Sequence, residues 1–404
     1  MPRDPQTFSV GEGHDPSEHG WSLKTPIYET ATFVFESAEA GKRYFEVVYQ
    51  GAPLEPGERL PYAYSRLDSP NLRVVESRLA RWEETDDALV FNSGMAAIYT
   101  VFISLLNPGD LVLHSTPMYG ATADILRNLM GRFGVISKSF GPGTTVEEIK
   151  QLIGGDRLAM IYVETPANPT VDIFDIELTS SVAAGRGAIT VVDNTFLSPV
   201  LQRPARHGAD VVVHSATKYL GGHNDLTAGV VCGRQDLIDL LRHDRYRIGT
   251  TAQPSTASML GRSIETLQMR VERQTTTATQ LAGFLNDHPK VAAVNHLSLL
   301  APDDPSYETY KKQCLGPGAM IALEVAGGEG AAFRFLNALK VVRLAVSLGG
   351  TESLAMHPWS TSHAQIPPEE NTANGVTPGL IRFSVGVEAV EDLIHDLARA
   401  LDQV

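Results

Sequence analysis

An amine and a carboxylate follow two strand-like runs in the middle of the chain. Lys218 lies just after the apolar run 211–213, and Asp193 follows the apolar run 188–192. Continuous β-branched runs are typical of strands buried on both faces of a parallel sheet. Ligands of open α/β sheets bind outside the carboxyl ends of the strands, so we expect both side chains in one crevice. For Lys218 taken alone, a solvated loop lysine would be the preferred interpretation.

The pair suits the chemistry of pyridoxal phosphate (PLP). This cofactor needs an amine that forms a Schiff base and a carboxylate that keeps the pyridine nitrogen protonated. Asp193 at a strand end, followed by the S-x-T-K sequence of residues 215–218, is typical of such a site. The words VVDNTF and SATKYLGGH, in this order and spacing, resemble the Cys/Met metabolism (trans-sulfuration) family of PLP-dependent enzymes.

The resemblance implies a cofactor site around these two residues. Lys218 carries the cofactor and removes protons from the substrate, while Asp193 binds the ring nitrogen. The turn 92–95 resembles the family's S-G-M word, and small residues at a helix start let backbone amides approach a phosphate. A glycine at such a turn is also common without any ligand. The other cofactor-binding residues implied in this region are Ser93, Gly94, Met95, Thr195, Ser215 and Thr217.

Three upstream residues complete the implied cofactor site. Tyr119 matches the family tyrosine that stacks on the pyridine ring and protonates the leaving group, which suits an aromatic face with a hydroxyl. Tyr64 and Arg66 lie in a Y-S-R word that, in the family, binds the cofactor phosphate of the adjoining subunit. An arginine fork suits a phosphate. The sequence continues LDSPN, where the family more often has x-x-N-P-T, and without the downstream motifs these residues would be interpreted as loop residues.

Substrate binding is assigned by the same resemblance. Asn168, in the word ETPANP, lies near the ring hydroxyl and the substrate carboxylate, and Arg382 in GLIRFSVGVE meets that carboxylate, with Ser347 beside it. An arginine among apolar residues is costly unless an anion meets it, although a buried structural ion pair is the alternative. For Glu164, a structural and a catalytic role are both open.

The position before Ser347 bears on the substrate. Relatives that handle cystathionine commonly have glutamate there, whereas Val346 offers an apolar wall. A wall of this kind favours a short thioether and leaves a distal ammonium unpaired. Ala121 replaces the cysteine of well-known methionine γ-lyases, and DNTFLSP resembles the synthase wording. We therefore predict γ-elimination from methionine or homocysteine, with γ-replacement (cystathionine γ-synthase or O-acylhomoserine sulfhydrylase) or cystathionine γ-lyase activity as alternatives.

Composition excludes several kinds of partner. The 404-residue chain has 33 Lys and Arg against 47 Asp and Glu, a net charge of −14, which argues against nucleic acid and anionic membranes. The basic word RHDRYR at 242–247 is short and contains Asp244, so we expect a solvated helix end. No G-x-G-x-x-G fingerprint follows a strand and no Walker loop occurs. The partners that remain are an amino-acid substrate and further copies of the chain.

The cysteines and the start of the chain indicate a location. Cys232 and Cys314 are too far apart in the sequence to suggest a disulfide framework or a metal site, so we expect no metal and a reducing, cytoplasmic compartment. Residues 1–15 are polar and lack the apolar core of a signal peptide. The apolar stretch 88–106 is interrupted by a turn, so we do not expect a membrane span.

Strand-like and helix-like runs alternate, which predicts a mostly parallel sheet covered on both faces. We expect strands at 88–91, 111–114, 160–163, 188–192, 211–213, 227–231 and 320–325, and helices at 72–82, from 96, at 258–275 and at 330–339. Residues 1 to about 60 show no long amphipathic helix, and 46–61 is longer than the family leads us to expect.

The resemblance, which extends from about residue 20 to the C-terminus, implies a fold class. This is an α/β PLP-dependent transferase of the aspartate aminotransferase-like type, fold type I, with a mostly parallel central sheet and a smaller C-terminal α/β domain. We expect an N-terminal arm (1–65) that contacts a neighbouring subunit, a PLP-binding large domain (66–262) and a small domain (263–404). A homo-oligomer follows, and a homotetramer built as a dimer of dimers is the family's habit. An aminotransferase or a non-catalytic scaffold of the same fold remains an alternative.

Overall fold

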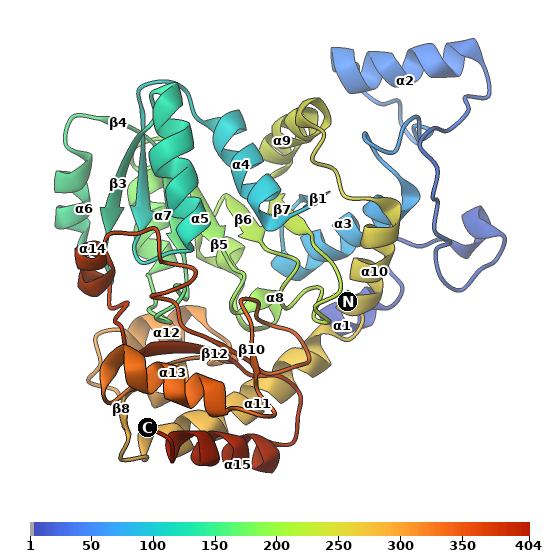
Figure 1. Ribbon diagram of the computed structural model, residues 1–404. Coiled ribbons are helices and arrows are strands. Elements are labelled where there is room, and N and C mark those ends of the chain that lie inside the picture. The colour runs from blue at the N-terminus through green and yellow to red at the C-terminus, as the bar shows by residue number, and fades with distance from the viewer. Residues whose placement is uncertain (1–3) are drawn as a thin grey trace.

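The larger of two β-sheets brings several strand ends to one edge. The computed structural model describes residues 4–404, and its first sheet has the order β1-β7-β6-β5-β4-β2-β3 (Figure 1). Every neighbouring pair in this sheet is parallel except the two that involve β7. The strands are β1 (Asp87–Phe91), β2 (Asp110–Ser115), β3 (Ile136–Phe140), β4 (Arg157–Glu164), β5 (Ile189–Asp193), β6 (Val211–His214) and β7 (Gly229–Gly233). The predicted α/β class with a mostly parallel sheet is confirmed.

Helices cover both faces of this sheet because successive strand residues alternate between the faces. Along β4, Met160 and Tyr162 join the apolar cluster on one face, while Ile161 and Val163 join the cluster on the other. The helices are α3 (Pro70–Glu83), α4 (Gly94–Leu105), α5 (Gly120–Asp124), η2 (Ile125–Met130), η3 (Gly131–Phe133), α6 (Val146–Ile153), α7 (Ile176–Ala184), α8 (Ser198–Leu201), η4 (Pro204–His207) and α9 (Gln235–Ile248).

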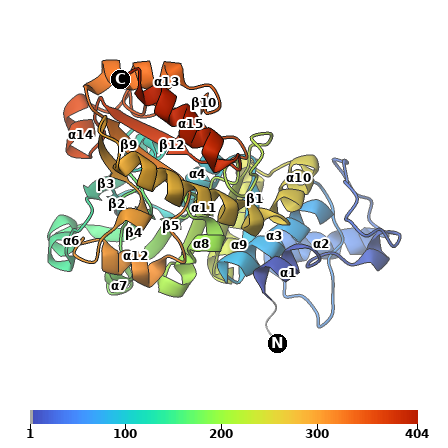
Figure 2. The same ribbon diagram turned by 90° about the horizontal axis from the view of Figure 1, so that it is seen from below.

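A smaller sheet, of order β10-β11-β12-β9-β8, follows in the C-terminal part. Its strands are β8 (Val291–Asn295), β9 (Met320–Val325), β10 (Arg343–Leu344), β11 (Leu354–Met356) and β12 (Leu380–Ser384). The accompanying helices are α11 (Leu267–Asn286), η5 (Leu297–Leu299), α12 (Tyr307–Gln313), α13 (Gly328–Ala338), α14 (Pro368–Ala373) and α15 (Val390–Leu401). In Figures 1 and 2 this sheet, α13 and α15 lie to one side of the larger sheet, with α11 leading into them, whereas α12 lies beside α7.

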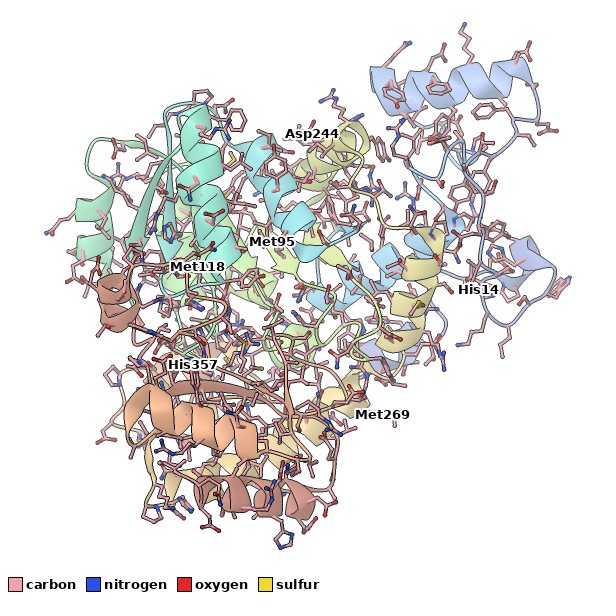
Figure 3. The ribbon with its side chains drawn as sticks, in the orientation of Figure 1. His14, Met95, Met118, Asp244, Met269 and His357 are labelled. Atoms are coloured by element: carbon pink, nitrogen blue, oxygen red, sulfur yellow. The ribbon has the colours of Figure 1, made fainter. Side chains whose placement is uncertain are left out.

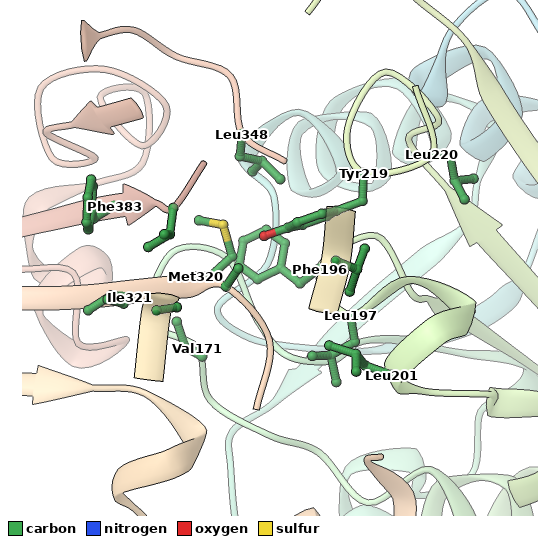
Figure 4. Close-up of a cluster of buried hydrophobic side chains, with 14 of the residues drawn as sticks. Val171, Phe196, Leu197, Leu201, Tyr219, Leu220, Met320, Ile321, Leu348 and Phe383 are labelled. Carbon is green, nitrogen blue, oxygen red and sulfur yellow. The ribbon is translucent and has the colours of Figure 1, made fainter. Parts of the chain in front are cut away.

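One continuous apolar core joins the two sheets. Leu348 and Met320 from the C-terminal part pack with Phe196, Leu201 and Tyr219 from the first sheet's connections (Figure 4). A shared core of this kind resists separation of the two parts, because separation would expose apolar surface to water. It therefore holds the C-terminal strands in a fixed position relative to the strand ends of the first sheet.

The predicted helix at 258–275 is two helices, α10 (Pro254–Ile264) and α11. Thr266 leaves the helical conformation, with φ −112° and ψ 10°. Its hydroxyl donates to the carbonyl of Ser263, and local bonds of this kind compete with continuation of a helix. The predicted boundary between residues 262 and 263 falls near the end of α10.

The expectation of an N-terminal region without a long helix is wrong. After α1 (Pro5–Ser9) and η1 (Pro16–His19), the chain forms α2 (Ala38–Gln50), which projects from the body of the protein (Figure 1). Ser37 caps α2 by accepting from the N–H of Ala40, and Gly51 ends it with φ 71°. Tyr44 packs with residues around Tyr246 of α9 in a small separate cluster. Ser37 before this segment and Gly51 after it were the sequence signals for a helix here, because serine is favoured at the start of a helix and glycine at its end.

The basic word at 242–247 also differs from its expected place. Arg245 is fully buried in α9, and its Nη1 donates to Oε1 of Glu76 at 2.6 Å and to the carbonyl of Val90 at 2.9 Å. Arg247, on another face of the helix, is exposed and pairs with Asp244 (labelled in Figure 3). The interpretation as a solvated helix end is thus wrong for Arg245. Within residues 4–404, no helix combines the length and apolar character that crossing a bilayer requires.

Candidate active site

A cavity of about 230 Å³ lies at the carboxyl edge of the first sheet, where the C-terminal part meets it. Its position is the one that open parallel sheets provide for ligands. Most of the predicted site residues line it, together with several that were not predicted. The lining residues are Ser93, Gly94, Met95, Ile98, Tyr119, Glu164, Asn168, Asp193, Thr195, Phe196, Ser215, Thr217, Lys218, Thr227, Val346, Leu348 and Arg382.

Lys218 brings its amine into this cavity from the turn after β6. Its Nζ donates to Oγ of Ser347 at 3.1 Å. Burial, and secondarily the positive charge of Arg382, lowers the pKa of Lys218 to about 8. A larger neutral fraction near neutral pH makes this amine more nucleophilic than a solvated lysine.

Asp193 ends β5 and is 6% exposed. Its Oδ1 accepts from the N–H of Thr195 at 3.0 Å, and its Oδ2 accepts from the hydroxyl of Tyr162 at 3.2 Å. Burial raises the pKa of the Asp193 carboxyl, so a positively charged partner is needed to favour its ionised form. A protonated ring nitrogen is such a partner.

Two further residues of β4 belong to the site. Tyr162 was not predicted, and Glu164 was left without a role. They lie two residues apart, so the alternation of a strand places both side chains on the face that carries the site. That period-two relation to the already suspected Glu164 was the sequence signal that could have pointed to Tyr162.

Glu164 accepts hydrogen bonds from two loops of the site. Its Oε2 accepts from the N–H of Tyr119 at 2.9 Å, and its Oε1 accepts from the N–H of Asn168 at 2.8 Å. Burial, followed by the charge of Asp193, raises the pKa of Glu164 to about 8. The carboxyl therefore links two predicted functional residues through their backbones.

The turn between β1 and α4 has the form of an anion cradle. Ser93 caps α4 by accepting from the N–H of Ala96 at 3.1 Å, which leaves the preceding amides of the first turn without intrahelical partners. A Cβ on Gly94 would lie 2.9 Å from Cβ of Ser215, so glycine permits this close approach. Thr195 fixes the opposite wall, since its hydroxyl accepts from the N–H of Ser215 at 2.9 Å. Met95 lies at the same end of α4 (Figure 3).

Arg382 reaches the cavity from β12 and is 4% exposed. Its Nη1 donates to Oδ1 of Asn168 at 2.9 Å, and its Nη2 donates to the carbonyl of Ser347 at 2.9 Å. Its buried Nε has no hydrogen-bond partner among the described residues. Burial lowers the pKa of Arg382 to about 10. A guanidinium that is buried and bonded only to neutral groups is suited to a carboxylate ligand.

The remaining walls are aromatic or apolar. Tyr119, at the start of α5, is 40% exposed and lines the cavity, and Val346 is 70% exposed along the same opening. Phe196 and Leu348 complete this side and were not predicted. The described lining residues contain two carboxylates, Asp193 and Glu164, both already engaged by hydrogen bonds.

Tyr64 and Arg66 are not brought into this cavity. Arg66 donates from Nη1 to the carbonyl of Tyr246 at 2.6 Å, and its guanidinium lies 5.5 Å from the centre of the Tyr64 ring. Tyr64 is 43% exposed. Their place on the arm is compatible with a role in a neighbouring subunit's site, which stays a prediction.

The residues present fit pyridoxal phosphate. The glycine-lined helix start suits the phosphate, the carboxylate of Asp193 suits a pyridinium nitrogen, and the amine of Lys218 suits the aldehyde. Cofactor site and α/β scaffold together define the class of fold type I PLP enzymes.

Comparisons with known proteins identify the family. Residues 6–402 match the family described as Cys/Met metabolism PLP-dependent enzyme. The chain is 41% identical to an L-methionine gamma-lyase of Pseudomonas putida over 98% of this chain and 96% of the relative. It is 36% identical to a cystathionine beta-lyase of Coxiella burnetii over 98% and 97% of the two chains. The chain belongs to the Cys/Met metabolism family of PLP-dependent enzymes.

A solved structure supports the same fold. Cystathionine gamma synthase from Xanthomonas oryzae pv. oryzae, in complex with aminoacrylate and cysteine, superposes with a TM-score of 0.90 at 31% identity, over 100% of this chain and 99% of that one. The predicted family, fold type and cofactor are therefore confirmed. The protein is a PLP-dependent enzyme.

Proposed function

We propose that the protein is a carbon–sulfur lyase that carries out γ-elimination on a sulfur amino acid. From methionine and water it would release 2-oxobutanoate, ammonia and methanethiol. From homocysteine it would release hydrogen sulfide in place of methanethiol. Bound PLP supplies an electron sink for the carbanions formed at the substrate's α- and β-carbons.

The protein's own residues then have separate tasks. The neutral amine of Lys218 accepts the α-proton and afterwards a β-proton, and its low pKa suits this work near neutral pH. The hydroxyl of Tyr119 donates a proton to the departing sulfur. Arg382 and Asn168 bind the substrate carboxylate. Asp193 holds the proton on the ring nitrogen.

The apolar wall at Val346 is the observation that favours a short thioether substrate. Both described carboxylates that line the cavity are already engaged, so the distal ammonium of cystathionine would lack an anionic partner there. A wall that offers this ammonium no ion pair favours a shorter, uncharged side chain. The name of the Pseudomonas putida relative supports the same substrate.

γ-Replacement on an O-acylhomoserine is the second candidate. Ala121, in place of the cysteine of well-known methionine γ-lyases, and the word DNTFLSP favour it, as does the synthase name of the Xanthomonas structure. Cystathionine γ-lyase activity is a further alternative. γ-Elimination and γ-replacement use the same first proton transfers. They differ in whether the unsaturated product is released as a 2-oxo acid and ammonia or is attacked by a thiol.

We propose an oligomer in which Tyr64 and Arg66 bind the cofactor phosphate of a neighbouring subunit. Exposed apolar side chains along residues 21–34 of the arm support this, since Trp21 is 79% and Val34 92% exposed. The division into an arm (1–65), a large domain (66–262) and a small domain (263–404), the assembly into a homotetramer and the cytoplasmic location belong to the same proposal. Cys232 and Cys314, both free, suit a reducing compartment.

The test incubates the PLP-loaded protein with methionine, homocysteine, cystathionine and O-acetylhomoserine, each with and without an added thiol. We expect 2-oxobutanoate and methanethiol from methionine without added thiol. Reduction with borohydride followed by peptide mapping is expected to place the cofactor on Lys218. Thioether formation from O-acetylhomoserine, with no 2-oxo acid from methionine, would replace the proposal by the second candidate.

A further inference from the structure

Glu164 occupies a junction between the two loops that carry Tyr119 and Asn168. It is 4% exposed, and each of its oxygens accepts from the backbone of a different loop, at 2.9 Å and 2.8 Å. The carboxylate thus spans the gap between the ends of β2 and β4. A displacement of Glu164 would move both loops.

A second hydrogen bond joins the ends of β2 and β4, and in this one Glu164 is the donor. The N–H of Glu164 donates to Oγ of Ser115 at 2.9 Å, and Ser115 is the last residue of β2. Ser115 lies four residues before Tyr119. The two bonds together fix where the Tyr119 loop leaves the sheet.

The loop that carries Asn168 is under backbone strain. Val171 has φ 67°, a left-handed conformation that is costly for a β-branched residue, and it is buried. Strain of this kind persists only where the surroundings hold the chain in place. The bond from Asn168 to Glu164 provides such a hold, next to the side chain that bonds Arg382.

Placing a carboxyl at this point has a cost. Burial and the nearby charge of Asp193 raise the pKa of Glu164 to about 8. A glutamine would avoid that cost, but its side chain has one acceptor oxygen and one donor amino group. The two loops instead present two N–H donors at this point. Only the ionised carboxylate accepts from both, and these two hydrogen bonds favour the ionised form against the effect of burial.

We propose that Glu164 is a positioning residue that fixes the Tyr119 hydroxyl relative to Asn168 and, through Asn168, to Arg382. Its effect on turnover is thus indirect, through the distance between the proton donor for the leaving group and the site that holds the substrate carboxylate. The inference rests on the roles proposed above for Tyr119, Asn168 and Arg382. Its first test does not depend on those roles.

That test is hydrogen–deuterium exchange, measured by mass spectrometry in the PLP-loaded protein and after removal of the cofactor. Pro166 and Pro169 have no N–H, so a peptide that covers 166–170 reports on few amides besides that of Asn168. We expect Glu164→Ala to speed exchange in this peptide and in one that covers 117–121. We expect Glu164→Gln to speed exchange mainly in one of the two, because one acceptor remains.

Asp396→Asn is the matched control. Asp396 is also a buried carboxylate that accepts from backbone N–H groups, those of Lys340, Val341 and Val342, but it lies outside the cavity. We expect this variant to lower the melting temperature while exchange at 117–121 and 166–170 stays unchanged. Unchanged exchange in the peptide of β9 would show that the Glu164 variants are folded.

Turnover provides the second test. A displacement of about 1 Å in a reacting group can cost roughly 10²-fold in rate, so we expect a loss of that order in kcat for Glu164→Ala. In a Tyr119→Phe background the same substitution is expected to cost much less, because the two residues act together. Equal losses in both backgrounds, or protected amides in Glu164→Ala, would make Glu164 a structural carboxylate and overturn the proposal. Faster exchange in a protein whose wild type has no lyase activity would overturn the proposed function and leave the positioning of the two loops established.

Discussion

The hydroxyl of Tyr162 donates a hydrogen bond to Oδ2 of Asp193 at 3.2 Å, within a fully buried part of the first sheet. Burial raises the pKa of the Tyr162 hydroxyl well above its ordinary value, so it stays protonated and remains a donor. This bond favours the ionised carboxylate and opposes the effect of burial on Asp193. Tyr162 thus supports the charge that a pyridinium nitrogen requires.

Tyr162→Phe tests this relation. We expect PLP affinity to fall roughly ten- to a hundredfold, because a hydrogen bond to a charged group contributes about 1.5–3 kcal/mol. The pKa of Asp193 would rise further without the donor, so the visible absorption of bound PLP is expected to change as well. Titration of the cofactor-free protein with PLP measures both. Tyr310→Phe, at a half-buried tyrosine of α12, is the control, and an unchanged spectrum and affinity in Tyr162→Phe would contradict the role.

The pKa of Lys218 makes a second prediction about cofactor attachment. Because the pKa is lowered to about 8, the neutral amine increases as pH rises through 8 and is nearly complete above 9. The rate at which the cofactor-free protein attaches PLP is therefore expected to rise through pH 8 and then level off. Stopped-flow absorbance at several pH values measures this rate. A rate that still climbs steeply between pH 9 and 10 would indicate an ordinary lysine.

Most of the site could be predicted because its residues follow buried strands. Apolar runs marked β4, β5 and β6, and parallel strands bring their carboxyl ends to one edge. Asp193 and Lys218 therefore line one cavity without any contact having been known in advance. The resemblance to the family supplied Asn168 and Arg382, and their contact depends on how the second sheet packs on the first.

Other features could not be predicted, because their partners are distant in the sequence. Tyr162 has the character of a core aromatic, and only the register between β4 and β5 brings it to Asp193. Arg245 lies in a basic segment whose composition is typical of a solvated helix end, yet it pairs with Glu76, 169 residues away in the sequence. Burial of a charge depends on tertiary packing, which local composition does not contain.

The buried pair of Arg245 and Glu76 supplies a prediction on stability. Removing one partner of a buried ion pair typically costs about 3–5 kcal/mol. Arg242 lies 3.8 Å from the other oxygen of Glu76 and would still offset part of its charge. We therefore expect Arg245→Met to lower the free energy of unfolding by about 3 kcal/mol, the low end of that range, as measured by urea denaturation. Arg247→Met, at an exposed pair with Asp244, is expected to cost about 0–1 kcal/mol. Equal effects of the two substitutions would show that burial of Arg245 adds nothing.

A site shared between subunits predicts complementation. Arg66→Ala chains keep Lys218, and Lys218→Ala chains keep Arg66, so a hybrid dimer would contain one complete site of two. We expect verified hybrids to recover about half of the wild-type activity per dimer, while either variant alone stays largely inactive. Differently tagged chains, co-expressed and purified over both tags, give the measurement. Hybrids no more active than the parents would place Arg66 outside the neighbouring site.

Val346→Glu tests how the cavity selects its substrate. Val346 is 70% exposed and lines the opening, so a glutamate there would face an incoming side chain. Its carboxylate would pair with the distal ammonium of cystathionine and would be left without a partner beside the thioether of methionine. An ion pair at a largely exposed position contributes about 0.2–1 kcal/mol, so we expect the ratio of kcat/KM for methionine to that for cystathionine to fall by up to roughly fivefold. Val341→Glu, at a half-exposed valine outside the cavity, is the control and is expected to leave the ratio unchanged. Wild-type protein is expected to prefer methionine, and a preference for cystathionine before any substitution would contradict the role assigned to the apolar wall.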